Sequence, residues 1–215
     1  MEQQSKPAPG KREARKQDRR RTIMATARRM FLEQGYAATS MSAIAAELGG
    51  SKATLWSYFP SKEALFEAAL DDATAVYRRE LTDLLRPSPD LEATVLAFTR
   101  GFIAKITSHD SIQLHRVVAA EAARSPEVGK IFARVPQRTR QLLADFFAAA
   151  MAAGQLRADD PAAAANVLTY LCMGLQQRML WGGTLPTRTE IEAEAACATA
   201  VFLRAYAPDG SGDAA

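Results

Sequence analysis

The stretch Ser40–Phe59 reads SMSAIAAELGGSKATLWSYF and contains two short runs of helical period on either side of a double glycine. In the first run Ile44 and Leu48 recur four residues apart, and in the second Leu55 and Phe59 do the same. Each run is therefore predicted to form a short helix with one apolar face. Two such helices joined by a glycine turn form a helix-turn-helix pattern, which also occurs as a plain packed corner in all-helical proteins.

The second of these helices has an outward face that suits DNA. With Leu55 and Phe59 turned inward, the outward positions are Lys52, Ala53, Thr54, Trp56, Ser57 and Tyr58. Small residues near the start of a helix let it enter the major groove closely, and its N–H groups favour phosphate. Threonine and lysine can reach base edges, while the Trp N–H and Tyr O–H can donate to phosphate oxygens. An exposed tryptophan also favours a partner surface over a packed corner.

The rest of the chain has helical period nearly throughout, so the protein is predicted to be all-α. Further helices are predicted at about 18–34, 61–86, 90–107, 110–123, 126–153, 160–181 and 187–206. The helix at 160–181 is apolar nearly all round and is expected to be buried at the centre of its domain or against a second subunit. Segments 1–17 and 208–215 are polar with proline and glycine, and are predicted to be disordered.

Charge is distributed unevenly along the 215 residues. Residues 1–62 hold 12 Lys/Arg against 5 Asp/Glu, whereas residues 63–215 hold 15 against 19, which together give the net charge of +3. The basic run within 11–21 is the densest part of this excess. It is explained either by an arm that binds DNA phosphates or a minor groove, or by an unstructured solubilising tail.

Several classes of protein are disfavoured. Cys172 and Cys197 form no C-x-x-C pair, no basic neighbour depresses a thiol pKa, and His109 and His115 lie off a common helical face, so neither a metal site nor a redox switch is expected. No apolar run is long enough to span a bilayer and the basic N-terminus lacks a signal-peptide core, so a cytoplasmic protein is expected. No phosphate loop, nucleophile elbow or pair of carboxylates at functional spacing points to an enzyme or to a cofactor.

The residues around the opening stretch also resemble a known family signature. The matching positions are Gly35-Tyr36, Thr39-Ser40-Met41, Ile44-Ala45, Leu48-Gly49, Ser51-Lys52, Thr54-Leu55-Trp56, Tyr58-Phe59, Lys62-Glu63 and Leu65. This pattern, over residues 21–66, resembles the signature of the TetR (tetracycline-repressor) family. The stretches 114–118 and 160–181 more weakly resemble the branch with an AefR-like C-terminal domain. Two positions depart from the family pattern: Ala43 replaces an acidic residue that closes a capping box, and Gly50 replaces Val or Ile in the turn, which predicts a looser turn.

The resemblance implies an all-α protein with a disordered basic arm (1–17), a three-helix DNA-binding head (18–63), a ligand-binding and dimerisation domain (64–207) and a disordered tail (208–215). The partners it implies are double-stranded DNA with a palindromic operator, a small-molecule effector, and a second copy of the chain bound through the last two helices, where the Ala-rich stretches 162–165 and 193–200 permit close approach. The implied DNA contacts are Thr39, Ser40, Ser51, Lys52, Ala53, Thr54, Trp56, Ser57, Tyr58 and Lys62. Thr39, Ser40 and Lys62 are expected on phosphates, and Ala53, Thr54 and Ser57 on base edges.

The effector site is the least visible feature. Candidate lining residues are Phe98, Phe102, Ile106, His109, His115, Phe132, Phe147, Met151, Tyr170 and Met173. Aromatic and methionine stripes at helical spacing are also what an ordinary core requires, so the alternative for each is a packing role. The implied function is a repressor that a small molecule releases from DNA. The alternative is a ligand-independent regulator or activator whose C-terminal domain serves dimerisation or binds a protein partner.

Overall fold

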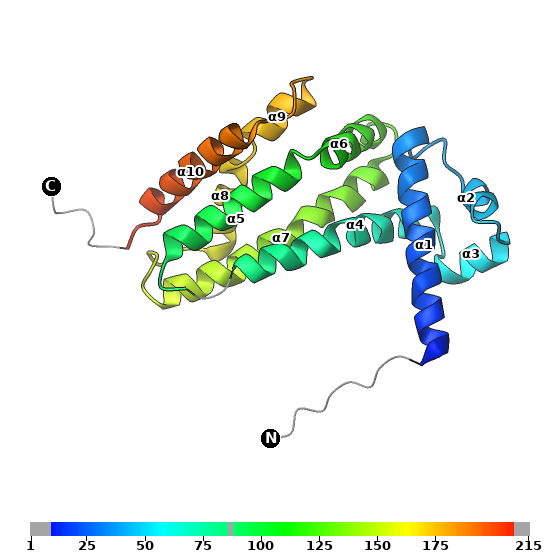
Figure 1. Cartoon of the computed structure of the whole chain (residues 1–215), viewed down its shortest axis with the longest axis horizontal. Coiled ribbons are helices and arrows are strands. Elements are labelled where there is room, and N and C mark those ends of the chain that lie inside the picture. The colour runs from blue at the N-terminus through cyan, green and yellow to red at the C-terminus, as the bar shows by residue number, and fades with distance from the viewer. Residues whose placement is uncertain (1–9, 86–87, 209–215) are drawn as a thin grey trace. The chain divides into compact units, whose positions relative to one another are not determined.

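The computed structural model describes residues 10–85 and 88–208, and this part of the chain contains helices and no strand (Figure 1). The helices are α1 (Lys11–Gln34), α2 (Met41–Glu47), α3 (Lys52–Tyr58), α4 (Lys62–Leu84), α5 (Leu91–Ile106), α6 (His109–Ala122), α7 (Pro126–Ala152), α8 (Pro161–Leu171), α9 (Gly174–Leu180) and α10 (Arg188–Ala205). The all-α prediction is therefore confirmed. The chain divides into two compact units, and the division falls between Ala73 and Thr74, within α4, ten residues beyond the boundary expected from the sequence.

The first unit is built around an aromatic cluster. Phe31, Tyr36 and Phe66 lie with ring centroids 5.0–5.5 Å apart, and all three are buried. Ile44 and Leu55, the inward residues of the two short helices, are also buried. The helix-turn-helix is thus attached to this core through one apolar face on each short helix, which leaves the other faces of α2 and α3 free for a surface role.

Helix α1 begins earlier than the sequence predicted. It starts at Lys11 rather than Asp18, so the expectation of disorder is wrong for residues 11–17. These residues are dominated by Ala, Arg, Lys, Glu and Gln, which have high helix propensity, and Gln17 Nε2 donates to Glu13 Oε1 at 3.1 Å along the helix. Low apolar content suggested disorder, but it means only that these helical turns do not pack against a hydrophobic core. Residues 1–9 and the tail from 209 lie outside the described residues.

The second unit packs α7 against α8 and α5 against α10. Phe147 of α7 stacks on Phe202 of α10 at 4.7 Å, and Phe202 stacks on Tyr206 at the same distance. Deep between α5 and α10, the hydroxyls of Thr99 and Thr199 form a hydrogen bond of 3.0 Å. No described helix is long and apolar enough to cross a membrane.

The prediction of a single helix at 160–181 is wrong, and of the two places expected for this stretch the centre of its own domain does not hold. The chain breaks between Leu171 and Gly174, because the carboxylate of Glu194 on α10 accepts from the Leu175 N–H at 2.9 Å and so begins a new helix, α9. Tyr170 and Trp181 are 63% and 83% exposed, so the stretch is not buried on all sides within this chain. Continuous apolar period revealed neither point, since a cap supplied by another helix leaves no local signal.

Candidate nucleic-acid interface and ligand pocket

Helix α3 is held by its two ends and by one buried side chain. The Ser51 hydroxyl accepts from the Thr54 N–H at 3.1 Å, and Leu55 and Phe59 are 2% exposed. The structure leaves the remaining predicted contact residues of this helix at the surface: Ser51, Lys52, Ala53, Thr54, Trp56 and Ser57 are exposed and Tyr58 is half-buried. These seven predicted residues thus form one accessible surface.

Ser40 caps α2, and its exposed hydroxyl accepts from the Ala43 N–H at 3.1 Å. Because Ala43 has no carboxylate, the reciprocal half of a capping box is missing here, as expected. The cap leaves Ser40 at the surface beside the helix N-terminus, where the predicted phosphate contact requires it.

Thr39 is not a surface residue, and its predicted role as a phosphate contact is wrong. The side chain is fully buried, and its hydroxyl donates to the carbonyl oxygens of Met30 and Gly35 at 3.2 and 2.8 Å. The Thr39 N–H also donates to the Gly35 carbonyl. Thr39 therefore ties the end of α1 to the start of α2.

Lys62, at the start of α4, lies over an aromatic ring. Its Nζ is 4.1 Å from the centroid of Tyr36 and 3.5 Å from the Ala37 carbonyl oxygen. The Tyr36 hydroxyl in turn donates to Glu63 at 2.9 Å. The pKa of Glu63 is lowered, first by a bond from its own backbone N–H and then by this hydroxyl. Lys62 keeps part of its surface exposed, so packing and phosphate contact remain compatible.

The sequence predicted that an apolar side chain is absent from the turn between α2 and α3. In the structure the basic side chain of Arg19 lies beside this turn. A Cβ on Gly50 would lie 3.0 Å from Arg19 Nη2, and the same nitrogen is 3.4 Å from the Leu48 carbonyl oxygen. Arg20 adds a second contact, over the ring of Phe59 at 5.0 Å. Arg19 therefore occupies the space beside the turn and interacts with the C-terminal end of α2, so the turn is not simply looser.

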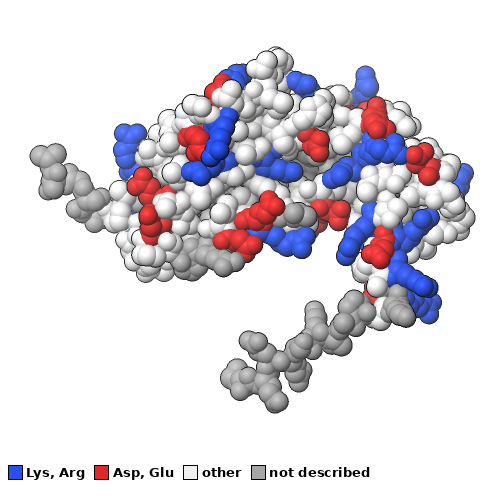
Figure 2. All heavy atoms as spheres, in the orientation of Figure 1, with Lys and Arg blue, Asp and Glu red and all other residues white. Residues whose placement is uncertain are grey.

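The contact made by Arg19 orients a row of cations on α1. Arg12, Arg15 and Lys16 precede it by seven, four and three residues, so all four lie on one face of the helix, the face that meets the α2–α3 turn. We call Arg12, Arg15, Lys16 and Arg19 the basic stripe. The first three are exposed, and Figure 2 shows basic side chains gathered over α1.

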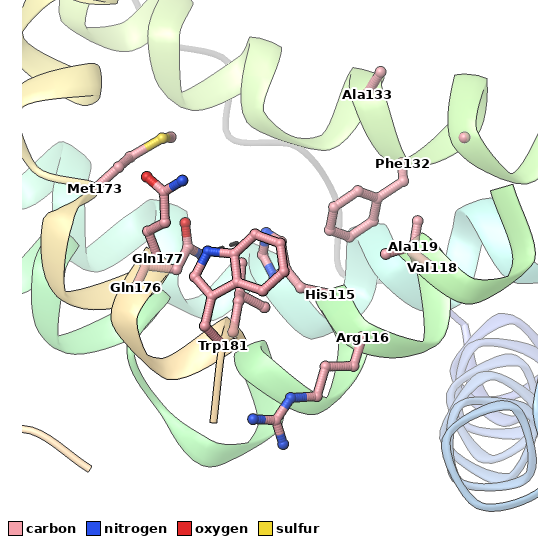
Figure 3. Close-up of a pocket in the computed structure, with 12 residues that line it drawn as sticks. His115, Arg116, Val118, Ala119, Phe132, Ala133, Met173, Gln176, Gln177 and Trp181 are labelled. Atoms are coloured by element: carbon pink, nitrogen blue, oxygen red, sulfur yellow. Dashed lines mark hydrogen bonds between the residues drawn. The ribbon is translucent and has the colours of Figure 1, made fainter. Parts of the chain in front are cut away.

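The second unit contains a pocket of about 750 Å³ between α6, α7 and α9 (Figure 3). Its lining residues are His115, Arg116, Val118, Ala119, Gly129, Phe132, Ala133, Met173, Gln176, Gln177, Leu180 and Trp181. This volume lies within the range of small-molecule sites, and the lining is mainly apolar with a few polar groups. The pocket is thus a candidate effector site.

Only some of the residues predicted to bind an effector line this pocket. His115, Phe132 and Met173 do. The others are placed elsewhere: Phe98, Phe102 and Phe147 are buried in the core, Met151 and Ile106 pack against that core, His109 is exposed beside Asp110, and Tyr170 is exposed. The structure does not place these residues on this pocket, and their spacing could not show that, because core and cavity lining have the same spacing on a helix.

The pocket residues that sequence reasoning missed carry a faint signal. Gln176 and Gln177 are adjacent polar residues inside an otherwise apolar stretch, and Trp181 is a large apolar residue next to a glycine pair. Both features are unexpected for a helix buried on all sides. They indicate a surface with a role other than packing within the chain.

Helix α9 forms one wall of the pocket and is held by three polar contacts, one from α6 and two from α10. Arg116 of α6 donates to the Met179 carbonyl at 2.7 Å, and Glu194 of α10 accepts from the Leu175 N–H. Arg178 donates to Glu190 of α10 at 2.6 Å, which lowers the pKa of that carboxyl to about 2. The wall is therefore connected by polar contacts both to the opposite side of the pocket and to the last helix.

No cluster of His, Cys, Asp and Glu in the described residues has the arrangement of a metal site. Cys172 is buried, which raises the pKa of its thiol to about 12 and keeps it protonated, and Cys197 is exposed on α10. The chemistry that the structure offers is therefore recognition by surfaces and hydrogen bonds.

An exposed, capped second helix of a helix-turn-helix, joined in the chain to a helical unit with its own pocket, defines a DNA-binding regulator of transcription. Residues 23–69 match the family model for bacterial regulatory proteins of the tetR family, and residues 93–208 match the model for the C-terminal domain of AefR-like transcriptional repressors. The chain belongs to the TetR family of transcriptional regulators, which are not enzymes.

Solved structures and a curated relative agree. A putative TetR-family regulator from Mesorhizobium loti MAFF303099 is 27% identical, with a TM-score of 0.77 over 92% of this chain and 99% of that one. The flavonoid-responsive regulator FrrA is 34% identical, with a TM-score of 0.72 over 86% and 95%. The transcriptional regulator LmrA of Bacillus subtilis is 28% identical over 97 residues, and the match spans 45% of this chain and about half, 52%, of LmrA.

Proposed function

We propose that the protein is a repressor that binds a palindromic operator as a homodimer through α3 and is released by a small molecule bound between α6, α7 and α9. The observation that carries the DNA-binding half is the accessible surface of Ser51–Tyr58, which contains the small residues, hydroxyls and cation that a major-groove helix uses. Trp56, 48% exposed, has no place in the core of its own unit.

The basic stripe supports a second element of DNA binding. Arg12, Arg15 and Lys16 lie on the face of α1 that meets the helix-turn-helix, so phosphates flanking the bases read by α3 are their natural partners. An unstructured solubilising tail needs no common face. We therefore assign these cations to phosphate contacts outside the half-site.

Dimerisation is supported by exposed apolar surface on two neighbouring helices. Val167 and Tyr170 of α8 are exposed, and α10, which packs beside α8, exposes Ala193, Ala196, Cys197 and Ala200. Small side chains permit close helix approach, and a second copy with the same faces buries both helices at once. Such a dimer has two copies of α3, one for each half of a palindromic operator.

The effector we propose is a polycyclic aromatic compound. FrrA, which is similar over most of its length, responds to flavonoids, and the pocket here presents Phe132, Met173 and Trp181. Another structural neighbour, from Saccharomonospora viridis, was solved with choline, but at 22% identity it supports the fold alone. No Asp or Glu is among the described residues that line the pocket, which disfavours a cation of that kind.

The test is to recover the bound sites by genomic footprinting and then to titrate the purified full chain onto that operator at several salt concentrations. Replacing Lys52 or Trp56 with alanine should weaken binding, and an aromatic effector should release the wild type. The triple change Arg12→Gln, Arg15→Gln, Lys16→Gln should make the logarithmic salt slope shallower by about 0.9 for each phosphate that is no longer neutralised.

Arg21→Gln is the matched control, because Arg21 is exposed on the opposite face of α1, where it is 3.8 Å from Asp18. A triple variant with the wild-type slope contradicts the role of the stripe. Operator binding that no candidate effector changes favours a ligand-independent regulator.

A further inference from the structure

The polar groups of the pocket form a chain of hydrogen bonds whose direction can be worked out from one end. His115 Nδ1 lies 2.7 Å from the Ser111 carbonyl oxygen, which can only accept. Nδ1 must therefore hold a proton, and in a neutral imidazole the other nitrogen, Nε2, is then an acceptor. Burial, its first cause, lowers the pKa of His115 despite the bond to Ser111, which favours this neutral form. The ring is also held edge-on to Phe132, 4.8 Å away.

The orientation of the Gln176 amide follows from that tautomer. Its Nε2 lies 3.4 Å from His115 Nε2 and 3.3 Å from the Ile106 carbonyl oxygen. Both neighbours are acceptors, so the amide group facing them must be the NH₂, and each of its two hydrogens has one acceptor. The two contacts agree on the same orientation, which removes the usual ambiguity between the oxygen and nitrogen of a glutamine.

The remaining atom, Gln176 Oε1, is an acceptor without a partner. No described residue donates to it, although the residue as a whole is only 6% exposed. Among the described residues, the one fully buried side-chain polar atom without a partner is the Tyr77 hydroxyl, so Gln176 Oε1 is not fully buried. Oε1 therefore has access to space, and Gln176 lines the pocket between α6, α7 and α9 (Figure 3).

We propose that Gln176 Oε1 selects effectors by accepting a hydrogen bond from a hydroxyl group, so that the ligand is an uncharged aromatic compound with at least one phenol. This inference rests on the proposed function only in taking the pocket as the effector site. The lining favours an uncharged ligand, because it contains no Asp, Glu or Lys among the described residues and its one guanidinium, Arg116, is exposed and donates to the Met179 carbonyl. A ligand without a donor would leave Oε1 desolvated and unpaired.

The test compares matched ligands on the unaltered full chain by isothermal titration calorimetry. The first pair is 7-hydroxyflavone and 7-methoxyflavone, and the second is 2-naphthol and 2-methoxynaphthalene; within each pair the methyl ether keeps the ring system and the oxygen but has no donor. The hydroxyl compound should bind about tenfold more tightly in at least one pair. Equal affinities in both pairs, or no binding by any of the four, overturn the proposal, and so does preferential binding of 2-naphthoate, an anion.

Gln176→Met keeps the length of the side chain and removes the acceptor, so the preference should fall to within about twofold. Gln141→Met is the matched control, since Gln141 is exposed on α7 and is not among the residues that line the pocket, and it should keep the tenfold preference. A Gln176→Met variant that retains the full preference overturns the role of Oε1. If that variant does not fold, as judged by its thermal melt, the wild-type ligand pairs still decide the matter.

Operator titration of the same wild-type sample separates the two levels of inference. Operator binding with no hydroxyl preference contradicts only the role of Gln176. Hydroxyl preference without operator binding contradicts the proposed function and leaves the pocket chemistry standing.

Discussion

The two units build their candidate sites in opposite ways. In the first unit, the surface assigned to DNA comes from residues 51–58, consecutive along one short helix whose opposite face is anchored by Leu55. In the second, the pocket combines residues of α6, α7 and α9 that are separated by up to 66 positions, from His115 to Trp181. A site on one element is rigid once that element is capped, whereas a site among three helices changes shape when any of them moves.

This difference suits a regulator. A DNA surface must keep its register, which caps and a single anchored face provide. An effector site must transmit its occupancy, and α9, tied to α6 by Arg116 and to α10 by Glu190 and Glu194, has the connections for that. Substitutions in each unit test whether the stability and the binding of the two units are independent.

The largest effects come from the two aromatic cores. Phe66→Ala should destabilise the first unit, and Phe147→Ala the second, each by about 3–5 kcal/mol, because each removes a buried ring that packs in its own aromatic cluster. Denaturant unfolding, followed together with operator and ligand binding, should show the first change abolishing operator binding and the second abolishing ligand binding. Leu185→Ala, at an exposed position outside the pocket, is the control and should cost about 0.5 kcal/mol or less. If both core changes shift one shared transition equally, the units are not energetically separate.

Thr39→Val tests whether the first unit uses Thr39 for structure or for DNA. The change keeps the shape and deletes the hydroxyl that bonds Met30 and Gly35, so stability should fall by about 1–2 kcal/mol. The operator affinity of the folded variant should not change, because a buried Thr39 contacts no phosphate. Thr22→Val removes an exposed hydroxyl from α1 and should be nearly neutral. A weaker operator affinity for a Thr39→Val variant that still folds would restore the phosphate role.

Removing one helix N-cap in each unit tests whether a short helix depends more on its cap than a longer, packed helix does. Ser51→Ala should cost about 1 kcal/mol and speed amide exchange in α3, since a seven-residue helix has few other bonds to hold it. Ser108→Ala removes the corresponding cap of α6 at a similar cost, but α6 is twice as long and packs on α7. Hydrogen exchange should therefore spread along all of α3 and stay within the first turn of α6. Equal spreading of fast exchange along both helices would contradict this difference between α3 and α6.

The smallest effect is expected in the turn. Gly50 has no positive φ, so Gly50→Ala requires only that the flexible end of Arg19 moves. Alanine lowers the conformational entropy of the unfolded chain, which stabilises the folded state by a few tenths of a kcal/mol. The contact of Arg19 with Leu48 is weakened at the same time, so the net change in stability should stay within about 0.5 kcal/mol. Gly49→Ala, at φ +61°, should cost about 1–2 kcal/mol. Thermal melts measure both, and a large destabilisation by Gly50→Ala would show that Arg19 is not free to move.

The DNA-binding head was predictable because its caps and its buried face depend on residues that are close together in the sequence. Ser40 and Ser51 each cap a helix through the N–H three residues further along the chain, and Leu55 and Phe59 show their burial by spacing alone. Thr39 was misassigned because a buried threonine that bonds carbonyls of the preceding helix has the same place in the sequence as one that meets phosphate. The helical start at Lys11 was missed because an exposed helix with no core partner has no apolar period.

The pocket was not predictable in the same way. Phe98, Phe102 and Phe147 have the same helical spacing as Phe132, yet the first three fill the core and the last lines a cavity. Which of them meets empty space depends on how far α7 and α9 stand from α6, and no local pattern contains that distance. The break before Gly174 depended likewise on Glu194, twenty residues away on another helix.

The sequence by itself determined the all-helical class, the caps of α2 and α3 and the outward face of α3, since these arise from interactions within about four residues, together with a family signature over 21–66. Only the tertiary structure decided that Thr39 is buried, that Arg19 fills the turn beside Gly50, and that His115 orients Gln176 so that one acceptor faces the pocket. Each of these depends on groups brought together from distant positions, and hydrogen-bond direction and cavity shape exist only after that packing is complete.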